Sequence, residues 1–272
     1  MAVEYAMLHD ISKCTGCRAC MVACKQWKDL PADPTPFVGE FQSHPDLSPT
    51  TLNLIRMTET IDEQGNFRWD FLKFQCMHCG DPACAKACPE EALIKKDNGV
   101  VSFIEENCVG CGYCAQNCPF GVPKIDKERN KSTKCNLCED RIEHGMVPAC
   151  AKTCTANAIL WGPREEMVAI AKKRVEELKK KYPHAQLYGV DKSDGVGGTT
   201  MMYVLTDKPS VFGLPDNPKV PVSLTIWKDI AQPGGKLLLG ATTMAVIGAL
   251  VSNTILNRGK KEAQEEGGSN HE

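Results

Sequence analysis

Sixteen cysteines fall into four groups of four, and the spacing within the groups suits the binding of iron–sulfur clusters. Four thiolates hold one 4Fe–4S cluster, and three thiolates within seven residues let the backbone curl around one face of it. No cysteine lies outside the groups. The pattern therefore predicts four 4Fe–4S clusters and a chain that transfers electrons one at a time. The groups are Cys14, Cys17, Cys20, Cys24; Cys76, Cys79, Cys84, Cys88; Cys108, Cys111, Cys114, Cys118; and Cys135, Cys138, Cys150, Cys154.

The spacing of the third group, followed by Pro119, is that of the complete bacterial ferredoxin run. In two-cluster ferredoxins the fourth cysteine of each run binds the other cluster. We therefore expect crossed ligation, with groups two and three in an inner unit and groups one and four in an outer one. The expected ligands are Cys14, Cys17, Cys20 and Cys154 for cluster 1; Cys24, Cys135, Cys138 and Cys150 for cluster 2; Cys76, Cys79, Cys84 and Cys118 for cluster 3; and Cys88, Cys108, Cys111 and Cys114 for cluster 4.

Two other uses of clustered cysteines fit this spacing less well. Zinc sites also use four cysteines, but usually as two separated pairs that close a tetrahedron. Disulfide bonds need paired side chains at a suitable separation and direction, which three cysteines within seven residues do not offer. A zinc-stabilised scaffold stays open as an alternative from a different class, and metal analysis distinguishes it from an iron–sulfur protein.

The elements around the cysteines predict an α+β fold of two nested ferredoxin-like units with insertions. Asn98-Gly99 lies between apolar runs and predicts a hairpin over 92–104. We also expect strands near 52–57, 67–74 and 200–206, and a helix over 164–181. The expected divisions are 1–24 with 125–160 (outer unit), 25–75 (insertion), 76–124 (inner unit), 161–230 (helix, strand and linker), 237–256 (transmembrane helix) and 257–272 (tail).

The C-terminal segment 237–256 carries no charged residue and predicts one transmembrane helix. Arg258, Lys260 and Lys261 follow it, which favours a cytoplasmic C-terminus with the cluster domain on the other side of the bilayer. The segment contains no histidine, and Met244 is its one candidate haem ligand. A haem is therefore expected in a partner.

Composition and motifs exclude several classes of function. A formal net charge of −2 and a pI near 6.3 give no indication of nucleic-acid binding. The N-terminus has neither a basic start nor an apolar run of signal length, so we expect the chain to be either cytoplasmic or exported with a partner that carries a signal. Dinucleotide and phosphate-binding glycine motifs are absent, and no nucleophile has a recognisable base partner. His78, between two ligands, is expected to make local hydrogen bonds. We therefore predict no catalytic site.

The cysteine stretches resemble those of the four-cluster ferredoxin subunits of molybdopterin oxidoreductases. They read CTGCRACMVAC, CMHCGDPACAKACP, CVGCGYCAQNCPF and CNLCEDRIEHGMVPACAKTC. Within that family, the chain is similar to the iron–sulfur beta subunit of membrane-bound respiratory formate dehydrogenase. The flanking stretches KQWKDLP, GVGGTTMMYVL and GLPDNP carry this further similarity, which extends over nearly the whole chain.

The resemblance implies three partners: a molybdopterin-containing catalytic subunit that oxidises formate, a membrane cytochrome b that reduces quinone, and the lipid bilayer. It implies export with a signal-bearing catalytic subunit, to the periplasm or another extracytoplasmic side. The outer unit would face the catalytic subunit, and the inner unit would lie nearer the haem. Some relatives lose one third-group cysteine and hold a 3Fe–4S cluster, so the presence of Cys111 implies four 4Fe–4S clusters. A relay subunit of a hydrogenase, or of a reductase of sulfur or nitrogen compounds, is the alternative.

Overall fold

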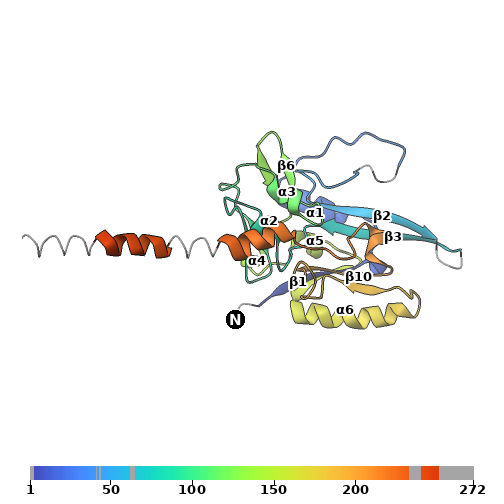
Figure 1. Cartoon of the computed structure of the whole chain (residues 1–272). Helices are drawn as coiled ribbons and strands as arrows, with labels where there is room; N and C mark the ends of the chain where they lie inside the picture. Colours follow the sequence, from blue (N-terminus) through green and yellow to red (C-terminus); the bar gives the residue numbers. More distant parts are fainter. Residues whose placement is uncertain (1–2, 41, 43, 62–64, 233–239, 251–272) are drawn as a thin grey trace, which may run out of the picture. The chain divides into compact units, whose positions relative to one another are not determined.

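The computed structural model describes residues 3–40, 42, 44–61, 65–232 and 240–250. The chain forms two compact units, Met1–Pro221 and Val222–Glu272. All sixteen cysteines belong to the first unit, where short helices and small sheets alternate along the chain (Figure 1).

The largest sheet of the first unit joins segments from both ends of that unit. Its strand order is β8-β1-β10-β9, with β1 parallel to β10 and the other pairs antiparallel. The two central strands have mostly buried side chains, as expected where both faces of a strand are covered. The strands are β1 (Tyr5–Asp10), β8 (Ile159–Pro163), β9 (Gln186–Tyr188) and β10 (Met201–Leu205).

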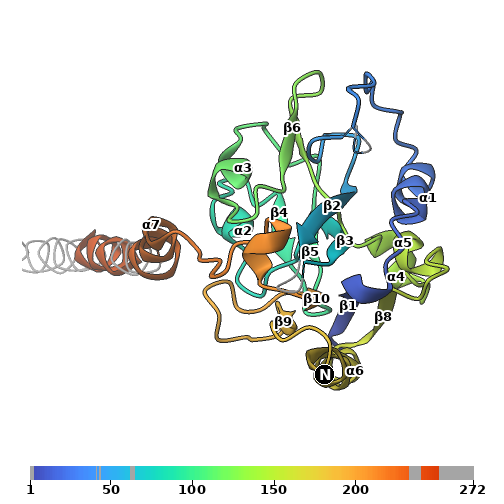
Figure 2. The ribbon, with the colours of Figure 1, turned by 90° about the vertical axis from the view of Figure 1, so that its right-hand side faces the viewer.

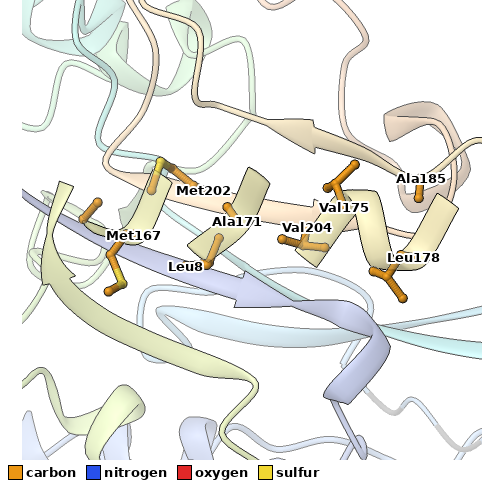
Figure 3. Packing of buried hydrophobic residues seen from close by; sticks show 9 residues of the cluster. Leu8, Met167, Ala171, Val175, Leu178, Ala185, Met202 and Val204 are labelled. Atoms are coloured by element: carbon orange, nitrogen blue, oxygen red, sulfur yellow. The ribbon is translucent and has the colours of Figure 1, made fainter. Parts of the chain in front are cut away.

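Helix α6 (Arg164–Lys179) covers one face of this sheet (Figure 3). Its apolar residues recur every three or four positions, which places them on one stripe of the helix. The predicted helix is therefore confirmed, although Ile170 is 38% exposed and lies outside the stripe. The core beneath α6 consists of Ala6, Leu8, Met167, Ala171, Val175, Leu178, Ala185, Met202 and Val204.

Three two-stranded sheets complete the first unit. The longest is regular from the pair Asn53 and Gln75 to the pair Ile61 and Phe67. The predicted hairpin around Asn98-Gly99 is confirmed, with Leu93 opposite Phe103. The pairs are β2 (Asn53–Ile61) with β3 (Phe67–Gln75), β4 (Leu93–Lys95) with β5 (Val101–Phe103), and β6 (Lys124–Asp126) with β7 (Lys131–Thr133).

Short helices next to the cysteine loops form two sets. Helix α1 (Ala19–Trp27) contacts α5 (Ala149–Lys152), and α2 (Ala83–Lys86) contacts α3 (Tyr113–Asn117). Figure 2 shows α1, α4 and α5 on one side of the first unit and α2 and α3 on the other. The described part of the first unit also contains the 3-10 turns η1 (Ile11–Lys13) and η2 (Pro209–Phe212), and α4 (Glu139–Glu143).

The second unit corrects the fold prediction at its C-terminal end. Here α7 (Val222–Thr225) leads into a π-helical turn η3 (Ile226–Ala231), and a helix runs over 240–250. None of the helices described is both long and apolar enough to cross a bilayer. The predicted transmembrane helix 237–256 is therefore not supported.

Among the described residues, the correction concerns helix length. A helix over 240–250 rises about 16 Å, whereas a bilayer core is about 30 Å thick. The other residues of the predicted span, 237–239 and 251–256, and the tail 257–272 lie outside the described residues.

Candidate metal centres

The cysteine loops have a common local design, in which a left-handed residue turns the chain into a short helix. Gly112 has a φ of 79° and precedes α3, which carries Cys114. Arg18 has a φ of 61° and precedes α1, which carries Cys20 and Cys24. Glycine adopts this conformation without steric cost. The turn places successive cysteines around one side of a loop, as ligands of one cluster require.

Groups one and four are brought together, although a long stretch of chain separates them. Burial raises the pKa of Cys14, and the nearby thiols of Cys154 and Cys17 raise it further. Burial also raises the pKa of Cys24 to about 12, with added contributions from the thiols of Cys135, Cys150 and Cys138. Cys14 is therefore near a thiol of the fourth group, and Cys24 is near three of them.

Groups two and three are likewise adjacent. Burial raises the pKa of Cys79 well above its usual value, and the thiols of Cys76, Cys118 and Cys84 reinforce the effect. These four cysteines are the predicted ligands of cluster 3. Because a buried thiol keeps its proton in the absence of metal, iron binding here must displace protons from the thiols.

The four predicted ligands of cluster 4 line one small cavity. They share its wall with Ser132, Leu93 and Phe103. The Ser132 hydroxyl lies 3.3 Å from the Cys114 sulfur, and the Ser132 backbone N–H donates to the Cys108 sulfur at 3.4 Å. The ligands on this cavity are Cys88, Cys108, Cys111 and Cys114.

The donor set fits iron–sulfur clusters. Backbone N–H groups of Ala92 and Leu137 donate to the sulfurs of Cys88 and Cys135, each at 3.3 Å. Such bonds stabilise thiolates and tune the potential of the bound cluster. All sixteen cysteines are described, and none forms a disulfide bond. In the described part of the chain, no three His, Cys, Asp or Glu side chains lie at single-ion separations.

Thiols of different predicted sets also affect one another's pKa. The Cys20 thiol interacts with Cys150, which links the sets of clusters 1 and 2. The thiols of Cys135 and Cys76 interact across the sets of clusters 2 and 3. Cys84 interacts with Cys114, across the sets of clusters 3 and 4. The four sets therefore form a continuous series.

Solvent reaches the two ends of this series most directly. Only Cys17, in the set of cluster 1, and Cys111, in the set of cluster 4, are exposed among the sixteen cysteines. The ligands of clusters 2 and 3 are buried or half-buried. Burial of the central sets excludes water, and exposure of the end sets leaves room for partners.

The loop 195–198 has a role that its sequence did not reveal. The backbone N–H of Gly80 donates to the Gly198 carbonyl at 2.8 Å, and that of Asp81 donates to the Val196 carbonyl at 2.6 Å. A Cβ on Gly80 would lie 2.1 Å from the Gly197 carbonyl oxygen. The loop therefore supports the second cysteine group, and Gly80 provides the space. Its glycines indicated only a loop.

Buried basic side chains are a second feature that the sequence did not indicate. Lys73 and Lys134 are buried near the thiols, and Lys134 donates to the carbonyl of Val101. His78 behaves as predicted, because its Nδ1 accepts a hydrogen bond from the Val101 backbone N–H at 2.9 Å. Burial lowers the pKa of His78, so it is neutral. Apolar periodicity gives no signal for a buried lysine.

Comparisons with known proteins agree with this chemistry. Two models of a 4Fe-4S dicluster domain match residues 13–92 and 67–164. The nitrate-inducible formate dehydrogenase iron-sulfur subunit of Escherichia coli K12 is 42% identical, covering 99% of this chain and 90% of that protein. The formate dehydrogenase-O iron-sulfur subunit of the same organism is 43% identical, covering 90% and 82%. The hydrogenase-2 operon protein HybA of E. coli O157:H7 is 32% identical, covering 98% and 88%.

The comparisons confirm the prediction of an electron-transfer subunit with four 4Fe–4S clusters. Two dicluster domains account for four clusters, and sixteen cysteines supply four thiolates for each. The high identity over nearly the full length also covers the segments outside the cysteine loops. The chain therefore belongs to the family of formate dehydrogenase iron–sulfur subunits.

Proposed function

We propose that this chain receives electrons from a molybdopterin-containing subunit that oxidises formate and relays them to a membrane cytochrome b, which reduces quinone. The observation that carries the proposal is the continuous series of four cysteine sets with one exposed thiol at each end. Similarity to formate dehydrogenase iron-sulfur subunits supports formate as the electron source.

The proposed ligand sets retain the crossed arrangement. Cluster 1 takes Cys154 from the fourth group, and cluster 2 takes Cys24 from the first. Cluster 3 takes Cys118 from the third group, and cluster 4 takes Cys88 from the second. The thiol neighbours of Cys14, Cys24 and Cys79, and the cavity shared by the cluster 4 cysteines, support these sets.

The thiol contacts between sets also support an order for the relay. Clusters 1, 2, 3 and 4 would follow one another, because in each of the pairs named above a thiol of one set raises the pKa of a thiol of the neighbouring set. Electrons would enter near Cys17 and leave near Cys111, the two exposed thiols. In this order the outer unit receives electrons and the inner unit delivers them.

A bound 4Fe–4S cluster supplies a one-electron carrier whose potential depends on its surroundings. The chain contributes the rest. Burial of its sulfurs excludes water from the central sets. Backbone N–H groups, such as those of Ala92 and Leu137, stabilise the negative charge of the thiolates. The support of Gly80 by the loop 195–198 fixes the second ligand loop in position. No proton transfer is required of the ligands during the relay.

Purification of the native complex without oxygen tests the proposal. We expect a formate-oxidising subunit with molybdenum or tungsten, a haem-containing membrane subunit, and four iron atoms for each cysteine set. Formate should then reduce both the iron–sulfur signals and the haem. Copurification of a nickel–iron subunit would instead indicate hydrogen as the electron source. The similarity to the hydrogenase-2 operon protein HybA is the reason to look for that subunit. Zinc in place of iron would refute the relay itself.

A further inference from the structure

The side chain of Lys73, on β3, has no solvent exposure at all. Its amino group has Gln75 Oε1 as a hydrogen-bond partner. In the part of the chain that the structure describes, no carboxylate forms an ion pair with it. An isolated buried charge is costly, so buried charges are normally paired. Lys73 therefore requires compensating negative charge from another source.

The surrounding strands hold Lys73 in a fixed position. Its backbone N–H donates to His9 Nδ1 on β1 at 3.4 Å. Its carbonyl accepts a hydrogen bond from the Tyr203 hydroxyl on β10 at 2.7 Å. His9 and Tyr203 are themselves fully buried and in edge-to-face contact, with ring centroids 5.9 Å apart. These contacts to two central strands fix the backbone of Lys73. The fold therefore determines where its amino group lies.

Thiols from both outer sets lie near enough to this amino group to affect its pKa. Burial lowers the pKa of Lys73, but the thiols of Cys150, Cys20, Cys135 and Cys24 outweigh burial and raise it. Cys20 belongs to the proposed set of cluster 1, and the other three belong to that of cluster 2. Once these thiols hold iron they are thiolates, and their negative charge supplies the missing compensation.

We propose that Lys73 is a potential-setting residue that stabilises the reduced state of clusters 1 and 2. Reduction adds one electron, and hence one negative charge, to a cluster. A fixed positive charge in a low-dielectric interior favours that addition. The electron comes from the proposed formate-oxidising partner and moves on along the relay, so Lys73 neither gains nor loses a proton. This inference rests on the ligand sets of the proposed function.

A purely structural role for Lys73 makes a different prediction. If the side chain served only to fill space and bind Gln75, a neutral residue of similar size would preserve cluster potentials. Lys73→Met keeps the length of the side chain and removes the charge. Lys73→Gln keeps a hydrogen-bonding group and also removes the charge. A change of potential that the two variants share reports the loss of charge, and a difference between the variants reports packing and hydrogen bonding.

The test is a redox titration of the isolated complex followed by electron paramagnetic resonance. In both neutral variants we expect two of the four cluster signals to become harder to reduce. At a fixed potential their reduced-to-oxidised ratio should fall roughly tenfold, which corresponds to about 59 mV for a one-electron couple. The other two signals should keep their potentials. Lys192→Met is the matched control, because Lys192 is 63% exposed and pairs with Glu4 at the surface.

Unchanged potentials of all four signals in both neutral variants would overturn the inference. A shift of the same size in Lys192→Met would also overturn it, because the effect would then not depend on burial. Iron content and the number of signals are measured first in the unmodified complex. A complex without four signals would refute the ligand sets, whereas four signals with unshifted potentials would refute the role of Lys73 alone.

Discussion

The indole nitrogen of Trp27 lies 2.7 Å from a carboxylate oxygen of Asp140, across 113 positions of sequence. The other oxygen of Asp140 accepts a hydrogen bond from Lys28 Nζ at 2.8 Å. The Arg141 guanidinium lies 4.2 Å from the centre of the Trp27 ring. Trp27 is the last residue of α1, the helix that carries Cys20 and Cys24. Asp140 lies on α4, which begins directly after Cys138. The contact therefore joins the two halves of the proposed outer unit.

Removal of the Asp140 carboxylate should loosen that junction. The side chain is 48% exposed, so we expect Asp140→Ala to cost only about 1 kcal/mol. Iron should then be lost roughly fivefold faster to a ferrous chelator, and the outer clusters should be lost first. Glu176→Ala is the control, since Glu176 pairs with Lys179 on the same exposed helix face. Equal rates of iron loss in both variants would contradict a role for the junction.

A side chain on Gly80 should displace the loop that supports the second cysteine group. The new Cβ would lie 2.1 Å from the Gly197 carbonyl oxygen, and backbone cannot move aside easily. We expect Gly80→Ala to destabilise the chain by about 1–3 kcal/mol, measured by thermal unfolding without oxygen. Gly248→Ala is the control, because nothing lies within 4 Å of its Cβ position. A wild-type melting temperature for Gly80→Ala would show that the loop gives no support.

Asp33 anchors the insertion that follows the first cysteine group. Burial raises the pKa of Asp33, but hydrogen bonds from Thr50, Thr51, Ser48 and Lys25 outweigh burial and hold it well below its usual value. Because the folded pKa is depressed, this stabilisation is complete above the unfolded pKa of about 3.9 and is lost as pH falls through the folded value.

The Asp33 carboxylate therefore stays ionised between about pH 5 and 8. Over that range, the protection of the Thr50 and Thr51 amides from hydrogen exchange should be constant. Asp33→Asn should lose about 2 kcal/mol of that protection at neutral pH, since the amide is a weaker acceptor than the carboxylate. Cluster signals should be retained in the variant. Full protection in Asp33→Asn would show that the carboxylate does not hold the insertion.

Interruption of the relay at its third cluster should separate two activities. Cys84→Ser removes a proposed ligand of cluster 3 and should lower formate-dependent quinone reduction by more than tenfold. Reduction of an artificial dye should partly survive, because a dye can accept electrons before the damaged cluster. Both activities are measured on the same membrane preparation. Wild-type rates of quinone reduction would remove cluster 3 from the path.

Local sequence signals predicted the elements that depend on interactions between residues close in sequence. Asn98-Gly99 between apolar runs predicted the hairpin β4–β5, although its last strand pair, Lys95 with Val101, leaves a loop longer than two residues, in which Gly99 has a φ of 93°. The apolar stripe of Met167, Ala171 and Val175 predicted α6. The cysteine spacing predicted the iron–sulfur chemistry, since few other sites need three thiolates so close together.

Long-range features left no local signal. The parallel pairing of β1 with β10 places Met7 opposite Met201. This pairing depends on the folding of the whole chain segment between the two strands. The burial of Lys73 runs against its usual preference for the surface, so no pattern of hydropathy predicts it. The uncharged C-terminal segment suggested a bilayer span, but none of the described helices is both long and apolar enough to provide one.

The crossed ligation is the central claim, and Cys154 tests it most directly. Cys154 belongs to the fourth group in sequence but to cluster 1 in the proposed arrangement. Electron paramagnetic resonance of Cys154→Ser should therefore show the same altered cluster signal as Cys14→Ser, and Cys150→Ser should alter a different one. If Cys154→Ser and Cys150→Ser instead altered one common signal and Cys14→Ser another, each group would bind its own cluster and the nested arrangement would be wrong.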